Sequence, residues 1–157
     1  MKDYGNEVSE DDLTKGRDAR ALSKMDSLEV YSDGASRGNP GPAAIAFMIL
    51  SEDRKTLKRY SKCVGVRTNN QAEYEALISA LEFASTLSDQ QAVCYIDSEL
   101  VVKQLNGEYR VRNQKLKVLW RKVNALKQRF KRISFKHVSR TNRYIQEVDQ
   151  LANEALG

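Results

Sequence analysis

A run of eight consecutive apolar residues, AAIAFMIL, occupies positions 43–50. A strand without polar alternation is buried on both faces, so a sheet that contains it needs other elements packed on each side. Segments 28–33 and 57–66 alternate apolar and polar residues, which predicts two further strands. The connections between the three segments, SDGASRGNPGP and SEDRK, are rich in turn residues and favour an antiparallel meander.

Helical and strand-like patterns then alternate along the rest of the chain. Helices are predicted at 70–87, 99–105, within 110–132 and at 144–156, and strands at 92–96 and 133–138. This order predicts an α/β protein with a mixed five-stranded sheet flanked by helices, in one domain over 27–157. Residues 1–26 are polar and are interpreted as an N-terminal tail that is disordered or forms one short docked helix.

The positive charge of the chain is concentrated in one segment. The 157 residues include 26 Lys and Arg against 21 Asp and Glu, a formal net charge of +5. Between positions 110 and 132 there are ten Lys and Arg and no acidic residue. Such a stretch is a candidate phosphate-binding surface, and a solvated helix face is the alternative.

Several classes of protein are disfavoured by composition. Because no apolar run approaches the roughly 20 residues of a membrane span, and the N-terminus lacks an apolar signal segment, we expect a cytoplasmic protein without a membrane partner. Two cysteines and one histidine make neither a disulfide scaffold nor a zinc site. Cys63 and Cys94 lie in strand-like segments and are interpreted as reduced core residues.

Four carboxylates occupy positions that the predicted fold brings together. Asp33 and Asp97 follow predicted strands, Glu73 lies in the first turn of the helix between them, and Asp149 follows the apolar Val148 in the last helix. Each alone could be a turn residue, a helix N-terminal charge or a surface ion-pair member. Together, without a basic partner, they would repel one another strongly. Bound Mg²⁺ or Mn²⁺, which prefer oxygen ligands, would remove that repulsion.

Four sequence motifs carry a resemblance to a known family. They are YSDGASRGNPGPAAIAF at 31–47, TNNQAEYEAL at 68–77, YIDSELVVKQLNG at 95–107 and HVSRTNRYIQEVDQLANEAL at 137–156. In this order they resemble type 1 ribonuclease H, in a compact form that lacks the family's basic protrusion. The resemblance implies a ribonuclease H-like fold and a metal-dependent endonuclease that hydrolyses the RNA strand of RNA/DNA hybrids, leaving 5′-phosphate and 3′-hydroxyl ends.

The resemblance also assigns roles to individual residues. Asp33, Glu73, Asp97 and Asp149 would be catalytic and would hold two Mg²⁺ ions, with Mn²⁺ as a substitute, for a two-metal-ion mechanism. Residues expected to bind the hybrid are Gly34, Ala35, Ser36, Thr68, Asn69, Asn70, Gln71 and Asn113. Thr68 and Asn113 resemble the family's pocket for a phosphate of the DNA strand, with Arg67 as an addition. Helix capping is the alternative role for Asn69 and Asn70.

The chain departs from the family pattern at three places. The protrusion is absent, and we hypothesise that the cationic face of 110–132 takes over part of its role. His137 or Arg140 would assist product release, and Glu99 stands where relatives commonly have Gln. A monomer without an obligate protein partner is expected. Alternatives are an inactive hybrid-binding protein, a nuclease that also cuts double-stranded RNA, a reverse transcriptase nuclease domain, and a DNA nuclease or transposase of related fold.

Overall fold

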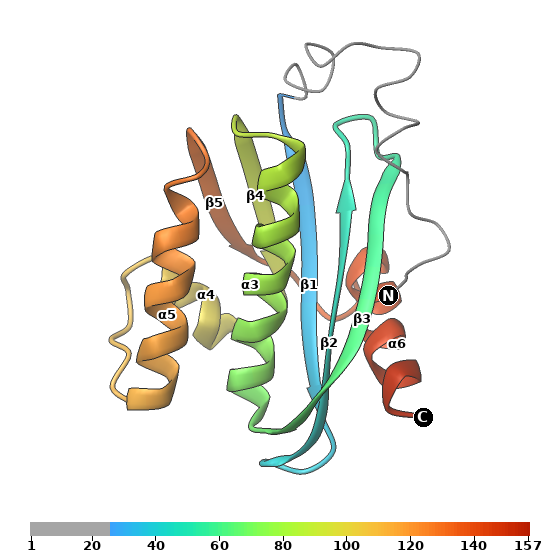
Figure 1. Ribbon diagram of the computed structural model, residues 1–157, viewed down its shortest axis with the longest axis vertical. Coiled ribbons are helices and arrows are strands. Elements are labelled where there is room, and N and C mark those ends of the chain that lie inside the picture. Colours follow the sequence, from blue (N-terminus) through green and yellow to red (C-terminus); the bar gives the residue numbers. More distant parts are fainter. Residues whose placement is uncertain (1–25) are drawn as a thin grey trace.

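The computed structural model describes residues 26–157, which form a mixed sheet with helices on both faces (Figure 1). The strands are β1 (Leu28–Ser36), β2 (Gly41–Leu50), β3 (Thr56–Arg67), β4 (Gln91–Ile96) and β5 (Arg132–His137). The helices are α3 (Asn69–Leu87), α4 (Glu99–Leu105), α5 (Gln114–Lys127) and α6 (Arg143–Leu156). This is the element order predicted from sequence periodicity, and the predicted fold class is confirmed. The expectation for residues 1–26 falls outside the described residues, apart from Asp26.

The sheet combines an antiparallel and a parallel half. Its five strands lie in the order β3-β2-β1-β4-β5. The meander β1, β2 and β3 pairs antiparallel, whereas β1, β4 and β5 pair parallel. Strand β1 therefore belongs to both halves, and the carboxyl ends of β1 and β4 lie next to each other. Parallel strands with intervening helices place ligand sites at such an edge.

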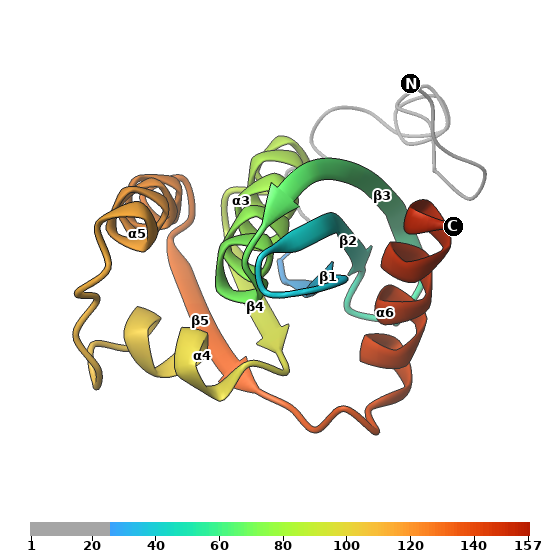
Figure 2. The ribbon, with the colours of Figure 1, turned by 90° about the horizontal axis from the view of Figure 1, so that it is seen from below.

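Strand β2 is buried on both sides, as its apolar sequence predicts. Phe47 and Ile49 belong to the larger core between the sheet and helices α3, α4 and α5. Ala46 and Met48, which alternate with them, belong to a smaller core against α6. Seen along the sheet in Figure 2, α3 and α5 lie on one side of the strands and α6 on the other. Within residues 26–157 every helix is too short or too polar to cross a lipid bilayer.

Two details differ from the sequence interpretation. Strand β1 continues to Ser36, beyond its expected end at Asp33 and into the expected turn, because its last residues pair with β2 as far as Ser36↔Ala43. Pairing with a neighbouring strand thus overrides the turn propensity of the DGAS sequence. Cys94 is buried as expected, but Cys63 is exposed, so its interpretation as a core residue is wrong. Strand β3 is the edge of the sheet, and its second half is covered less than the apolar pattern suggests.

The basic segment folds as predicted into an amphipathic helix. Leu116, Val123 and Leu126 of α5 are buried. Three of its five cations are exposed and two, Lys117 and Lys127, are half-buried. Asn113 caps the helix by accepting a hydrogen bond from the Leu116 amide at 3.0 Å. The helix is therefore anchored by its apolar stripe and its cap, which leaves the cations available to solvent.

Gly34 allows α3 to pack directly on β1. A β-carbon on Gly34 would lie 2.3 Å from the backbone carbonyl carbon of Ala72, the residue that precedes Glu73 in α3. Because the contact is with backbone, no side-chain rotation can relieve it. The absence of a side chain at Gly34 thus sets the distance between Asp33 and Glu73.

We expect Gly34→Ala to lower the free energy of unfolding by at least about 3 kcal/mol, because helix and strand must separate. Gly107→Ala is the control: its backbone has φ +78° but nothing lies within 4 Å of the added β-carbon. That control should cost only about 1–2 kcal/mol of backbone strain. Urea denaturation of both variants measures the difference, and a Gly34→Ala loss no larger than that of the control would contradict the close-packing argument.

Candidate active site

Asp33 and Asp97 come from adjacent strands at the same edge of the sheet. The parallel pairing of β1 with β4 ends at Tyr31↔Tyr95, and each aspartate lies two residues beyond its paired tyrosine. Asp33 is still within β1, because that strand continues along β2, whereas Asp97 follows the end of β4. The strand register therefore brings two carboxylates together from positions 64 residues apart in the sequence.

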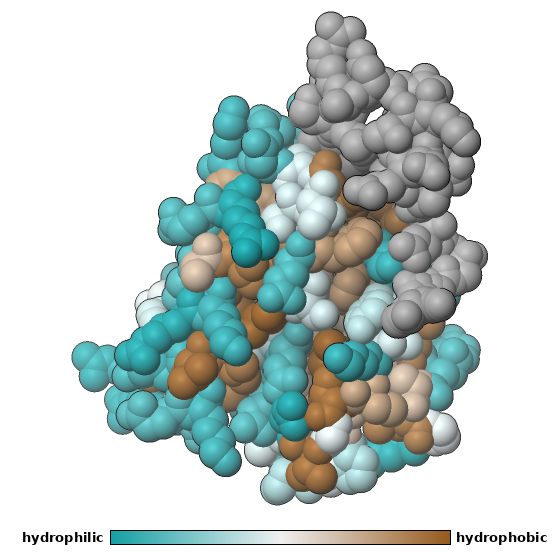
Figure 3. Space-filling model, viewed as in Figure 1, coloured by the Kyte–Doolittle hydropathy of each residue, from teal (hydrophilic) through white to brown (hydrophobic). Residues whose placement is uncertain are grey.

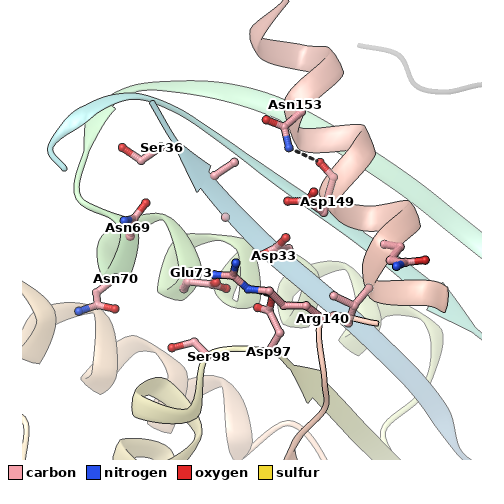
Figure 4. Close-up of a pocket in the computed structure, with 14 residues that line it drawn as sticks. Asp33, Ser36, Asn69, Asn70, Glu73, Asp97, Ser98, Arg140, Asp149 and Asn153 are labelled. Carbon is pink, nitrogen blue, oxygen red and sulfur yellow. Dashed lines mark hydrogen bonds and ion pairs between the residues drawn. The ribbon is translucent and has the colours of Figure 1, made fainter. Parts of the chain in front are cut away.

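Glu73 reaches the same place from α3. Thr68 is the N-cap of this helix, so Glu73 lies in its second turn rather than in the first turn expected from the sequence. One carboxylate oxygen from each of Asp33, Glu73 and Asp97 lies within 4.8 Å of those of the other two. Figure 4 shows the three side chains converging from β1, α3 and the end of β4.

Burial makes this cluster electrostatically unfavourable. Asp33 is 3% exposed and Glu73 is 9% exposed, and the buried Glu73 Oε1 has no hydrogen-bond partner among residues 26–157. Burial, followed by the charge of Asp97, raises the pKa of the Asp33 carboxyl to about 8. Burial and the charge of Asp33 hold the pKa of Glu73 well above its ordinary value. The cluster thus favours bound protons or bound cations.

Asp149 completes the site from the opposite side. It lies on α6, is exposed, and lines the same cavity of about 490 Å³ as the other three acids. Figure 4 shows Asp149 facing Asp33 from the α6 side of the cavity, and its charge contributes to the raised pKa of Asp33. It is not, however, one of the three residues whose oxygens lie mutually within 4.8 Å. The structure therefore brings all four predicted carboxylates to one cavity, three in close contact and one across from them.

A basic residue also faces this cluster, contrary to the expectation of acids without a basic partner. Arg140 Nε lies 3.7 Å from Asp97 Oδ2, and the arginine side chain is 91% exposed. Arg140 lines the cavity, whereas His137, at the end of β5, does not. Of the two residues considered for product release, only Arg140 is thus positioned at the site.

The four acids fit a divalent cation. All their donor atoms are carboxylate oxygens, which hard cations such as Mg²⁺ prefer. Glu73 Oε1 has no hydrogen bond that a cation would have to break. A divalent charge would also offset the repulsion that raises the pKa of Asp33. The residues present therefore match the metal that the acidic cluster led us to expect.

The residues expected to bind substrate divide between two neighbouring cavities. Gly34, Ala35, Ser36 and Asn69 line the cavity of the acids. Thr68, Gln71, Asn113 and Arg67 line a second cavity of about 840 Å³, and Asn70 lines both. Sequence reasoning missed Gln146 and Asn153, which line the first cavity from α6. Their spacing from Asp149, three and four residues, was the signal that they share its helix face.

The second cavity lies where two helices begin. Thr68 Oγ1 accepts a hydrogen bond from the Gln71 amide at 3.2 Å, and the Gln71 side chain accepts one from the Thr68 amide at 2.8 Å. Thr68 therefore caps α3, so the capping role considered for Asn69 and Asn70 belongs to their neighbour. The N-terminal ends of α3 and α5 both carry the positive end of the helix dipole, and together they favour an anion between them.

We expect Asp33→Asn to stabilise the metal-free protein at pH 8. The folded state raises the pKa of Asp33 from 3.8 to about 8, so it retains a proton that the unfolded state releases in this range. The stabilising effect of that proton is complete below pH 3.8 and is lost as the pH rises to about 8. Removing the charge should raise the free energy of unfolding by at least about 1 kcal/mol at pH 8.

Thermal denaturation in chelator and in Mg²⁺ measures this effect. Added Mg²⁺ should raise the melting temperature of the original protein more than that of Asp33→Asn, because the variant offers a weaker ligand set. Asp89→Asn, at an exposed position between α3 and β4, is the control and should change neither value. A metal-free Asp33→Asn protein that is less stable than the original at pH 8 would argue against buried charge repulsion.

Comparison with known proteins identifies relatives of this fold and site. The model of the reverse transcriptase-like family matches residues 31–155. The ribonuclease HI of Halobacterium salinarum is 40% identical over 129 residues, which cover 82% of this chain and 64% of that protein. A bifunctional protein of Mycobacterium tuberculosis is also 40% identical over 129 residues, covering 81% of this chain and 35% of that protein. The chain thus spans about one to two thirds of the length of these curated relatives.

Solved structures agree in fold over nearly all of the described chain. RNase H1 of H. salinarum has a TM-score of 0.79 at 40% identity and covers 83% of this chain and 97% of its own. The N-terminal RNase H domain from M. tuberculosis has a TM-score of 0.79 at 36% identity, covering 83% and 99%. LC11-RNase H1, solved in complex with an RNA/DNA hybrid, has a TM-score of 0.75 at 40% identity, covering 82% and 95%.

The family model covers most of the chain. Two solved relatives are matched over 97% and 99% of their own length, at 40% and 36% identity. The motifs that carry the sequence resemblance also supply the four acids of one cavity. On these grounds the chain belongs to the type 1 ribonuclease H family.

Proposed function

We propose that this protein is a metal-dependent endonuclease that hydrolyses the RNA strand of RNA/DNA hybrids. The observation that carries the proposal is the cluster of Asp33, Glu73 and Asp97, whose oxygens lie within 4.8 Å of one another at the base of an open cavity. A relative of 40% identity has been solved with an RNA/DNA hybrid, which supports the choice of substrate. The products would carry 5′-phosphate and 3′-hydroxyl ends.

The four acids would act as ligands rather than as nucleophiles. Asp33, Glu73, Asp97 and Asp149 would hold two Mg²⁺ ions, or Mn²⁺ as a substitute, with Asp33 shared between the two. When bound, such ions activate water and stabilise the charge of the phosphate under attack and of the leaving oxygen. The chain's own contribution is to keep these carboxylates fixed on β1, β4 and two helices, so that little reorganisation is needed.

The walls of the cavity would select the RNA strand. Gly34 and Ala35 offer backbone groups, and Asn69 and Asn70 offer side-chain amides, beside the carboxylates. Hydrogen bonds from such groups to 2′-hydroxyls across a shallow minor groove distinguish RNA from DNA. Asn39 Oδ1 accepts a hydrogen bond from the backbone N–H of Asn69 at 3.0 Å, which connects the turn after β1 to the start of α3. The recognition groups are thus held in one rigid unit.

The second cavity would hold a phosphate of the complementary DNA strand. Thr68 and Asn113 use their side-chain oxygens as acceptors for helix capping, which leaves the Thr68 hydroxyl hydrogen and the Asn113 amide to donate to a phosphate. Arg67 adds positive charge, and its Nε lies 2.5 Å from Glu75 Oε2, which orients the guanidinium. Because Asn70 lines both cavities, the two strands of a hybrid could contact them together.

Arg140 is the residue that we assign to product release. Its exposed side chain reaches over the cavity and contacts Asp97, so it can exchange that carboxylate for a product phosphate. The activity also implies access to hybrids within the cell, in keeping with the cytoplasmic monomer expected from the sequence.

Cleavage of labelled duplexes tests the function. With Mg²⁺ the protein should cut the RNA of an RNA/DNA hybrid, and Asp97→Asn should reduce the rate by at least about 100-fold, since a metal ligand is lost. Asp89→Asn is again the matched control and should cut at the original rate. Double-stranded RNA and double-stranded DNA are the comparison substrates. Hybrid cleavage that survives in Asp97→Asn, or preferential cutting of double-stranded DNA, would refute the proposal.

The salt dependence of binding tests the role of α5 in place of the absent protrusion. Lys115 lines the second cavity, and Lys117 and Arg121 follow it along the helix. Reversing all three charges to Glu should weaken hybrid binding and reduce the slope of log K against log salt concentration by about 2 to 3.

A charge-matched control distinguishes local contacts from net charge. Arg129 and Lys131 follow the carboxyl end of α5 and Arg132 begins β5, and none of the three lines the first or the second cavity. Their reversal to Glu should leave the slope nearly unchanged. Equal slopes for the two triple variants would show that net charge alone governs binding.

A further inference from the structure

A third cavity adjoins the second at the start of α5. It has a volume of about 610 Å³ and lies between the α4–α5 connection and the N-terminal half of α5; we call it the α4–α5 pocket. Its functional lining consists of Tyr109, Trp120, Arg110, Arg112, Lys117 and Arg121. The second cavity ends at Asn113 to Leu116, the residues immediately between the two halves of this lining. The α4–α5 pocket therefore adjoins the second cavity at the start of α5.

The pocket combines aromatic rings with cations, and no acidic side chain of residues 26–157 lines it. Lys117, Trp120 and Arg121 are spaced three and four residues apart, so they share one face of α5. Tyr109 is one of the few large apolar side chains in the described region that are substantially exposed, at 48%. Figure 3 shows hydrophilic side chains gathered over α5 on the same side of the molecule.

Each ring is held by a polar contact, but the two differ in burial: Tyr109 is exposed, whereas Trp120 is half-buried and packs against the main core. The Trp120 indole N–H donates to the Gln104 carbonyl at 3.3 Å, which satisfies its one polar atom. Lys103 Nζ lies 5.0 Å from the centre of the Tyr109 ring and 3.5 Å from its hydroxyl, and it also pairs with Glu99 at 3.3 Å. A fixed ring binds a planar ligand with little loss of conformational entropy.

We propose that the α4–α5 pocket binds unpaired nucleotides of the DNA strand where it continues beyond the hybrid. The proposal rests on the proposed function, because it extends the strand that the second cavity would hold. Aromatic rings that stack on bases, among cations that attract the phosphates, are the features that bind single-stranded nucleic acid without sequence preference. Cations alone would serve a duplex backbone, but an exposed ring such as that of Tyr109 has no stacking role there, since the bases of a duplex are already stacked.

Trp120 is the only tryptophan of the chain, so its fluorescence reports directly on this pocket. In chelator, where no cleavage occurs, an oligothymidylate of about ten nucleotides should bind and quench this fluorescence. A deoxyribose phosphate oligomer of the same length without bases should bind at least about tenfold more weakly, because it cannot stack. Equal affinity for the two oligomers, or binding without quenching, would overturn the proposal.

Two pairs of variants locate the effect. Tyr109→Ala should weaken oligothymidylate binding by about tenfold, whereas Tyr109→Phe, which keeps the ring, should stay within about twofold of the original. Arg121→Gln should weaken binding more than Lys122→Gln, since Lys122 is exposed on α5 but does not line the pocket. Unchanged affinity in Tyr109→Ala, with its fold confirmed by circular dichroism, would overturn the assignment of the stacking ring.

Cleavage of two hybrids separates this inference from the proposed function. A blunt hybrid and one with a single-stranded DNA extension should both be cut, and the extension should lower KM in the original protein but not in Tyr109→Ala. If the blunt hybrid is cut and the extension has no effect on either protein, only the pocket assignment fails. If neither hybrid is cut although the oligothymidylate quenches Trp120, the proposed function fails and the pocket assignment stands.

Discussion

Repulsion between buried carboxylates is the interaction around which this structure is organised. Asp33 and Glu73 are nearly inaccessible to water, yet each lies beside other acids. Protons or divalent cations lower the free energy of such an arrangement, and the surrounding sheet and helices supply the stability that holds it together. The close approach of the acids depends on Gly34, because only a residue without a side chain lets α3 approach β1 so closely.

Away from the acids the charge of the surface changes from negative to positive. The carboxylates favour cations, whereas the N-terminal ends of α3 and α5, together with Arg67 and the cations of α5, favour phosphates. A polyanion would therefore be bound by the positive surface on either side of the carboxylates. It would meet negative charge only at the carboxylates themselves, where a cation is required between the polyanion and the acids. Because the positive and negative groups lie on separate parts of the surface, a chain with formal net charge +5 can contain a concentrated acidic centre.

Much of the site could be predicted because its residues lie at the ends of well-defined elements. The alternation in 28–33 and the short strand before Asp97 placed both aspartates at one edge of a sheet. Glu73 was expected in the first turn of a helix that begins at position 70, whereas the capping box of Thr68 with Gln71 starts the helix at Asn69, so that Glu73 lies in its second turn. Cys63 was misplaced for a different reason: an alternating pattern does not reveal that its strand is an edge.

The sequence by itself predicted the order of elements, the double-sided burial of β2 and the four acids that line one cavity, because these depend on periodicity and on local motifs. Only the tertiary structure decided which acids lie within 4.8 Å of one another, that Arg140 faces Asp97 while His137 does not line the site, and that a third cavity adjoins the second. The physical reason is that periodicity specifies which face of an element is buried, whereas distances between side chains depend on strand register and on how closely backbones pack.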